Sequence, residues 1–280
     1  MDNNNVNSKQ QFLVLIDFSK GSYKALKYAI SMAKAIKSKL VLLHVATSRD
    51  FRKTDNPSVA LRAIDIAARQ KEVQFKSIVE MIESEGVAVE YINTVGDVFT
   101  QIKLYLAKYK PSLIVIGKSN YGQNKLGNIA NYLVYENIHN VLIIGNDFKF
   151  NKSTNISVAC NSKILIDDSS NILFWLNSKT RKPLKIFVSK RKNASEDFNF
   201  AKNGHRIVDE PHKICIQNTQ SFSLTRSIIN HISKEKIDLV CIGRKSTNKS
   251  FFNKLFNRPN ITSEVINNAR IPTLIMGSIS

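Results

Sequence analysis

Two places where a short apolar run ends could bind a ligand. Asp17 and Ser19 come after the run 12–16, and Gly117 ends the run 113–117. A carboxylate and a hydroxyl can hold a polar molecule, and glycine lets the backbone approach it closely. The sequence has no paired-carboxylate signature, nucleophile elbow, Walker-A lysine or metal-spaced His/Cys cluster. We therefore expect a binding protein and not an enzyme.

These residues also have a purely structural explanation. Asp17 can cap the next helix together with Ser19 or Ser22, which is a common role for Asp and Ser. Gly117 and Gly122 can be ordinary turn glycines. Ligand binding and helix capping therefore stay open as alternatives for this region of the chain.

Five other side chains of reactive types have simpler explanations. Cys160, Cys215 and Cys241 sit inside apolar runs, in an odd number and without a CxxC pattern. We expect reduced core thiols, and neither disulfides nor zinc ligands. His44 lies in an apolar run and is expected to be a core histidine. Lys118, on a loop, can meet a phosphate or face only solvent.

The elements that position these residues alternate between strand and helix. The first half has five apolar runs typical of buried strands, at 12–16, 40–46, 87–95, 113–117 and 141–145. Segments with apolar residues at helical spacing lie between them. Strands that are apolar at nearly every position are buried on both faces, so they predict a mostly parallel sheet covered by helices. The predicted fold class is α/β.

The second half repeats this order in reduced form. Its strand-like runs lie at 156–160, 184–189, 212–217, 237–243 and 272–277, roughly 125 to 145 residues after their counterparts. A shorter polar segment, 192–208, replaces the long helical segment of the first half. We place domain one at 1–146, a polar linker at 147–154 and a degenerate domain two at 155–280.

The first half resembles the universal stress protein family. The resemblance is carried by the D-x-S segment of Asp17 and Ser19, by the LLHV run 42–45, and by the runs 113–117 and 141–144. It implies a doubly wound, five-stranded parallel sheet in the order 3-2-1-4-5, of the adenine-nucleotide α-hydrolase-like kind. It also implies that the last strand often mediates dimerisation. Ligands of such sheets bind where the winding reverses, beyond the strand ends that carry Asp17 and Gly117.

The resemblance further implies an adenine-nucleotide site in domain one. ATP-binding members hold the nucleotide with the strand-one Asp and a G-x2-G-x9-G-[ST] loop, whose glycines approach the phosphates. Here Asn120 stands at the second glycine position, three residues are missing before Gly127, and Asn128 replaces the hydroxyl residue. The residues implied to bind ATP, ADP or AMP with magnesium are Leu15, Asp17, Ser19, Gly117, Ser119, Asn120, Gly122, Gly127, Asn128 and Ile129.

The corresponding site of domain two is largely lost. Asn161 stands where Asp17 would be, Ser246 replaces the second glycine, and Pro259 replaces Gly127. Proline removes an N–H group at the helix start, so we expect no ATP binding of the family type here. The loop 244–260 carries basic residues and phenylalanines. It fits either an amphipathic helical turn packed on the sheet or a contact surface for an anion or a protein.

Charge and hydrophobicity limit the kinds of partner. The formal net charge of +19 suggests nucleic acid or another polyanion as a partner. The basic residues are scattered over both halves, however, and this distribution disfavours a polyanion-binding surface. No apolar run approaches the roughly 18 to 20 residues needed to cross a bilayer, and the N-terminus lacks the apolar region of a signal peptide. We expect a cytosolic protein without a membrane partner.

Together these features predict a cytosolic stress-response or regulatory protein. Two copies on one chain can reproduce the contact that single-domain relatives make between chains, so the halves should pair through their last strands. A homodimer and an unidentified protein partner are both compatible with this prediction. The alternatives are a ligand-free protein interaction module and a polyanion-binding protein.

Overall fold

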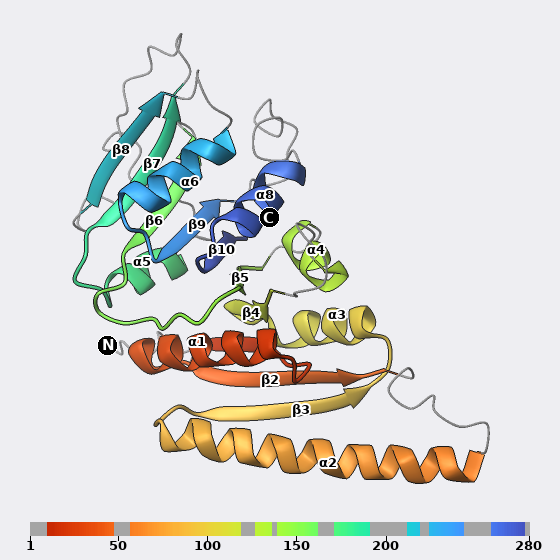
Figure 1. Ribbon diagram of the computed structural model, residues 1–280. Coiled ribbons are helices and arrows are strands. Elements are labelled where there is room, and N and C mark those ends of the chain that lie inside the picture. The colour runs from red at the N-terminus through yellow and green to blue at the C-terminus, as the bar shows by residue number, and fades with distance from the viewer. Residues whose placement is uncertain are drawn as a thin grey trace, which may run out of the picture.

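The computed structural model describes residues 10–47, 57–118, 127–135, 139–161, 171–190, 212–218, 224–243 and 259–277. Strands and helices alternate along these residues, and the strands form one sheet with helices on both faces (Figure 1). The α/β class predicted from the apolar runs is confirmed. The predicted segments 192–208 and 244–258 lie outside the described residues.

The strands of the first half lie side by side in the order β3-β2-β1-β4-β5. All of them are parallel to their neighbours within this half. Every residue of β5 is buried, as are all but the last of β4, which explains the continuous apolar runs. The order confirms the predicted 3-2-1-4-5 winding. The strands are β1 (Gln11–Leu15), β2 (Lys39–Ala46), β3 (Val89–Val95), β4 (Leu113–Gly117) and β5 (Val141–Ile144).

The second half has the same winding, in the order β8-β7-β6-β9-β10. Its strands are β6 (Ile156–Asn161), β7 (Leu184–Lys190), β8 (His212–Asn218), β9 (Leu239–Gly243) and β10 (Thr273–Met276). The internal duplication is also visible in equivalent backbone hydrogen bonds. Ile114 N donates to Asn140 O at 2.9 Å, and Val240 N donates to Pro272 O at 3.1 Å.

The two halves join through their last strands. β5 and β10 pair antiparallel, with Leu142 opposite Leu274. The result is one ten-stranded sheet instead of two separate five-stranded sheets. The contact between final strands, which the pairing hypothesis required, is therefore present.

Helices cover both faces of this sheet (Figure 1). One face packs against α1 (Lys20–Ile36), α2 (Pro57–Ser84) and α5 (Asn171–Asn177). The other face packs against α3 (Val98–Tyr109), α4 (Asn128–Tyr135), α6 (Leu224–Lys234) and α8 (Pro259–Asn268). None of the helices in the described part of the chain combines the length and the apolar character that a membrane span requires.

Both hydrophobic layers continue from one half into the other. The first layer contains Tyr28 of α1 and Cys241 of β9, and the second contains Ile114 of β4 and Val240 of β9. Cys241 is a buried free thiol, as expected, and burial raises its pKa. The core of this molecule is therefore shared between the halves.

The segment predicted as a polar linker is packed against α1. Phe150 is 3% exposed, and its ring lies 6.5 Å from that of Tyr28 in an edge-to-face contact. The backbone N–H of Phe150 also donates to Ser31 Oγ at 2.9 Å. Polar composition correctly indicated a segment without strand or helix, but the phenylalanines anchor it to the core.

Candidate functional site

The candidate site lies where the carboxyl ends of β1 and β4 meet. These strands are parallel neighbours, with Val14 opposite Val115, although most of the first half separates them in sequence. β4 continues the winding on the side of β1 that faces away from β2, so this is the point where the winding reverses. The segments that begin at Asp17 and at Lys118 leave the sheet here.

Asp17 and Ser19 form a compact turn at the start of α1. Asp17 Oδ1 accepts a hydrogen bond from Ser19 N at 2.9 Å. Ser19 is the N-cap of α1, because its Oγ accepts from Ser22 N at 3.2 Å. Partial burial alone would raise the pKa of Asp17, but hydrogen bonds from Ser19 and Ser22 outweigh it and hold the pKa below its usual value. The carboxylate therefore stays ionised, and the side chains of both Asp17 and Ser19 are exposed.

Phe18, between these two residues, has a left-handed backbone with φ of 61°. This conformation is unusual for a bulky side chain and needs support from its surroundings. The ring packs edge-on against His44 and Phe75, with centroids 4.9 and 5.1 Å away. The ammonium of Lys71 in α2 lies 3.9 Å from the centre of the ring. These contacts hold the turn, and spacing along the sequence did not reveal them.

His44 is a core residue, as the sequence predicted. Its side chain is 8% exposed, and Nδ1 lies 2.8 Å from the carbonyl oxygen of Ile16. A carbonyl oxygen only accepts, so Nδ1 carries a proton and donates it. His44 thus connects β2 to the segment that leads into the Asp17 turn.

Gly117 and Gly21 allow the end of β4 to touch the first turn of α1. A Cβ atom added at Gly117 would lie only 2.3 Å from the carbonyl carbon and oxygen of Gly21. A Cβ atom at Gly21 would lie 2.8 Å from the carbonyl oxygen of Lys118. Neither position has room for a side chain, so both glycines have a packing role here. This close contact also brings Lys118 next to the first turn of α1, which follows the Asp17 turn.

Lys118 is directed toward the second half of the molecule. Its Nζ donates to the carbonyl oxygens of Ile266 and Asn267 in α8, at 3.3 and 3.0 Å. Burial lowers the pKa of this lysine. Lys118 therefore neither faces only solvent nor points freely into the site, and the sequence contained no signal of its contact with α8.

The remaining predicted site residues are only partly covered by the structure. Gly127 and Asn128 are exposed at the start of α4, where Asn131 N donates to Gly127 O at 2.9 Å. Ile129 and Leu15 pack against the second hydrophobic layer. The other three, Ser119, Asn120 and Gly122, lie outside the described residues. A role for any of these residues in holding a ligand stays a prediction.

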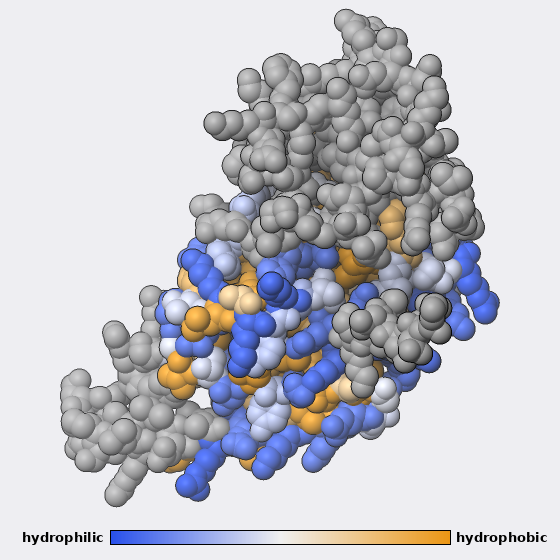
Figure 2. Space-filling model, turned by 180° about the vertical axis from the view of Figure 1, so that it is seen from behind, coloured by the Kyte–Doolittle hydropathy of each residue, from blue (hydrophilic) through white to orange (hydrophobic). Residues whose placement is uncertain are grey.

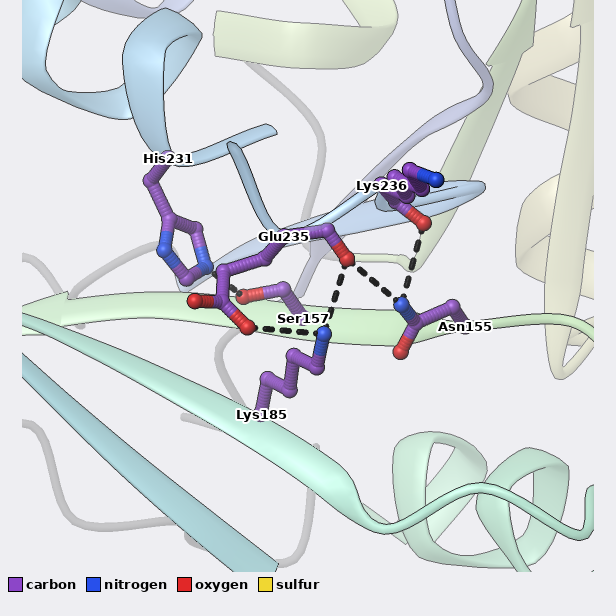
Figure 3. A network of polar contacts seen from close by, with 6 residues as sticks. All are labelled: Asn155, Ser157, Lys185, His231, Glu235 and Lys236. Atoms are coloured by element: carbon purple, nitrogen blue, oxygen red, sulfur yellow. Dashed lines mark hydrogen bonds and ion pairs between the residues drawn. The ribbon is translucent and has the colours of Figure 1, made fainter. Parts of the chain in front are cut away.

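A second polar network joins residues of the second half (Figure 3). Lys185 Nζ contacts Glu235 Oε2 at 2.9 Å and donates to Glu235 O at 2.8 Å. Asn155 Nδ2 donates to the carbonyl oxygens of Glu235 and Lys236. Since Asn155 precedes β6 and Lys185 is near the start of β7, the network stands at the amino ends of the strands. It satisfies carbonyl groups at the end of α6 and lies away from the carboxyl ends of the second-half strands, where a ligand of this half would bind.

Ser157 and His231 are part of the same network. Ser157 Oγ lies 2.8 Å from His231 Nε2, a spacing that a nucleophile and its base would also have. Their exposed fractions are 0% and 4%, and the ring of Phe187 lies 4.9 Å from that of His231. Both groups are thus enclosed between α6 and the sheet, and we assign them to packing.

Metal and surface features add little to the site. Across the residues that the structure describes, no group of three or more His, Cys, Asp or Glu side chains could hold a metal ion. On the face opposite to that of Figure 1, hydrophilic residues are interspersed with small hydrophobic groups over the coloured part of the surface (Figure 2). The junction of β1 and β4 is therefore the candidate site of this molecule.

Known proteins share the fold just described. Residues 9–145 match the model of the universal stress protein family. None of the curated proteins matches the sequence significantly. A universal stress protein from Archaeoglobus fulgidus has a similar structure with a TM-score of 0.73 and 17% identity, over 96% of this chain and 99% of that one.

Two further solved structures are similar over nearly the whole length. A putative universal stress protein from Pseudomonas aeruginosa has a TM-score of 0.60 and 15% identity, over 96% of this chain and 93% of that one. The cytoplasmic domain of a prokaryotic cation chloride cotransporter has a TM-score of 0.52 and 12% identity, over 96% of both chains. At these identities the likeness concerns the fold, including its repeat in the second half. With the matched residues and the winding order in agreement, the first half of this chain belongs to the universal stress protein family.

Proposed function

We propose that the protein is a cytosolic stress-response or regulatory protein that binds an adenine nucleotide in its first half. The observation that carries this proposal is the ionised, exposed carboxylate of Asp17 at the end of β1, next to the end of β4. An ionised carboxylate only accepts hydrogen bonds, which suits the hydroxyl groups of a ribose. Lys118, where the chain leaves β4, lies next to the first turn of α1, which begins directly after the Asp17 turn.

We propose binding without catalysis. Asp17 and Ser19 supply one carboxylate and one hydroxyl, and the nearby His44 donates to a backbone carbonyl within the core. General acid-base chemistry would need a further titratable group within reach of the ligand. Magnesium would enter with the phosphates of the nucleotide, since it keeps several water ligands and needs few from protein.

Calorimetric titration with ATP, ADP and AMP in the presence of magnesium tests the proposal. Asp17→Asn keeps an acceptor for Ser19 N but removes the charge. We expect micromolar binding to the natural chain and at least about tenfold weaker binding to this variant, because hydrogen bonds to charged groups contribute more. Asp97→Asn is the matched control, since Asp97 caps α3 with the same kind of bond, to Thr100 N at 2.9 Å. Equal affinity in Asp17→Asn, or no binding to the natural chain, would contradict the proposal.

A ligand-free interaction module is the second candidate. It is favoured by the internal contacts of Asp17, Ser19 and Lys118, each of which has a partner within the chain. A site in which the polar groups already satisfy one another gains less from a ligand. Absence of heat with all three nucleotides would favour this candidate and direct the search to protein partners.

A further inference from the structure

Lys118 connects the candidate site of the first half to the last helix of the second half. Its backbone N–H donates to Ile144 O at 2.7 Å, which places the residue where β4 ends and the loop begins. Its side chain passes Gly145, where an added Cβ atom would lie 3.4 Å from Lys118 Cδ. The ammonium then reaches α8, which lies against the junction of the halves near α4 (Figure 1).

The contact satisfies the end of α8. The last four carbonyl groups of an α-helix have no partner within the helix unless other groups supply one. Val265 O accepts from Ala269 N at 2.8 Å. The next two carbonyl groups, of Ile266 and Asn267, accept from Lys118 Nζ. A cation at this position also interacts favourably with the negative end of the helix dipole.

The partners of this ammonium are neutral. Both acceptors are backbone carbonyls, and within the described part of the chain no carboxylate forms an ion pair with Lys118. Burial is the cause of its lowered pKa, without an opposing anionic partner. A phosphate would add a direct charge–charge attraction to the ammonium, which a neutral carbonyl oxygen lacks. An anion within reach of Lys118 would therefore compete successfully with α8.

We propose that Lys118 couples ligand binding in the first half to the end of α8 in the second half. Without a ligand the ammonium stabilises the last turn of α8, and a phosphate-bearing ligand bound beside the carboxyl ends of β1 and β4 draws the same ammonium away. Ligand binding thus loosens the end of α8. This inference rests on the proposed nucleotide site.

Hydrogen–deuterium exchange of the full chain, read in peptides that cover α8, tests the coupling. Lys118→Met keeps the unbranched stem that passes Gly145 and removes the charge. We expect amides at the end of α8 to exchange about three- to tenfold faster in this variant than in the natural chain. Magnesium-ATP should cause a similar increase in the natural chain and no further increase in Lys118→Met. Lys110→Met, which removes another charge from the first half without touching α8, should behave like the natural chain.

Different failures can be told apart. Unchanged exchange of α8 in Lys118→Met would overturn the inference directly. If calorimetry shows that ATP binds but α8 exchange in the natural chain does not respond, the proposed site survives and the coupling is wrong. If ATP does not bind at all, the proposed function and its coupling both fail, and the Lys118→Met result still decides whether Lys118 holds α8.

Discussion

At the scale of single residues, the contact between Gly117 and Gly21 is the tightest constraint on the site. The end of β4 and the first turn of α1 touch through backbone atoms alone. A methyl group at either position would have to displace backbone, which is far less adaptable than the tip of a side chain. The position of the Asp17 turn relative to β4 depends on this contact.

Gly117→Ala should therefore lower the free energy of unfolding by at least about 1–3 kcal/mol. Gly145→Ala is the control, because it also follows a β-strand but an added Cβ would make only an ordinary contact, 3.4 Å from Lys118 Cδ. We expect it to stay within about 0.5 kcal/mol of the natural chain. Urea unfolding of both variants measures the difference. Equal free energies of unfolding for the two variants would show that β4 and α1 can move apart without a loss of stability.

The sequence pointed to some residues of the candidate site and missed the contacts of others. Asp17 and Ser19 were identified because polar residues after an apolar run belong to the end of a strand. Two features were missed, the left-handed backbone of Phe18 and the contact of Lys118 with α8. The sign of φ depends on packing against residues far along the chain, and a lysine on a loop gives no indication of which distant carbonyl it meets.

At the scale of elements, several helices end in the same unusual way. The residues after α1, α3, α6 and α8 that adopt left-handed backbone are all basic, namely Lys37, Lys110, Lys236 and Arg270. Glycine is the usual residue at such positions because it has no Cβ. A basic residue is disfavoured there sterically, but its charge is favourable near the end of a helix.

Lys110→Gly should raise the free energy of unfolding by roughly 0.5–1 kcal/mol, because relief of left-handed strain exceeds the greater flexibility of glycine in the unfolded chain. Lys110 has φ of 42° directly after α3. Lys108→Gly, within the last turn of α3, should instead lower the stability by about 1 kcal/mol. Thermal and urea unfolding compare the two. A loss of stability in both variants would mean that the charge of Lys110 outweighs its strain.

The elements themselves were largely predictable. Strands such as β4 and β5 are buried along nearly their whole length, so they appear in the sequence as uninterrupted apolar runs. Helix ends were less visible, because lysine after α1 and α3 replaces the glycine that normally marks them. The anchoring of residues 147–154 to α1 also escaped prediction, since two phenylalanines among polar residues show no period.

At the scale of the whole molecule, the shared hydrophobic layers predict that the halves unfold together. Leu42 lies in the first half and Leu176 in the second, yet both belong to the same layer and are 0% exposed. Trp175, the one tryptophan of the sequence, packs against that layer from α5. Its fluorescence therefore reports on the second half.

Leu42→Ala should lower the stability by about 2–5 kcal/mol and shift the Trp175 fluorescence transition as much as the circular dichroism transition. Leu176→Ala is the matched control in the second half and should likewise shift both signals together. A biphasic dichroism curve with an unchanged fluorescence midpoint in Leu42→Ala would instead identify two independent folding units.

The pairing of β5 with β10 has a consequence for how this chain can change over generations. In an assembly of identical subunits, every substitution at the contact occurs twice, and each copy must tolerate its own image. Here the ratio of the halves is one to one at any level of expression and at any dilution, and a substitution alters one side alone. A contact such as that of Lys118 with α8 can therefore change in one half without the same change in the other.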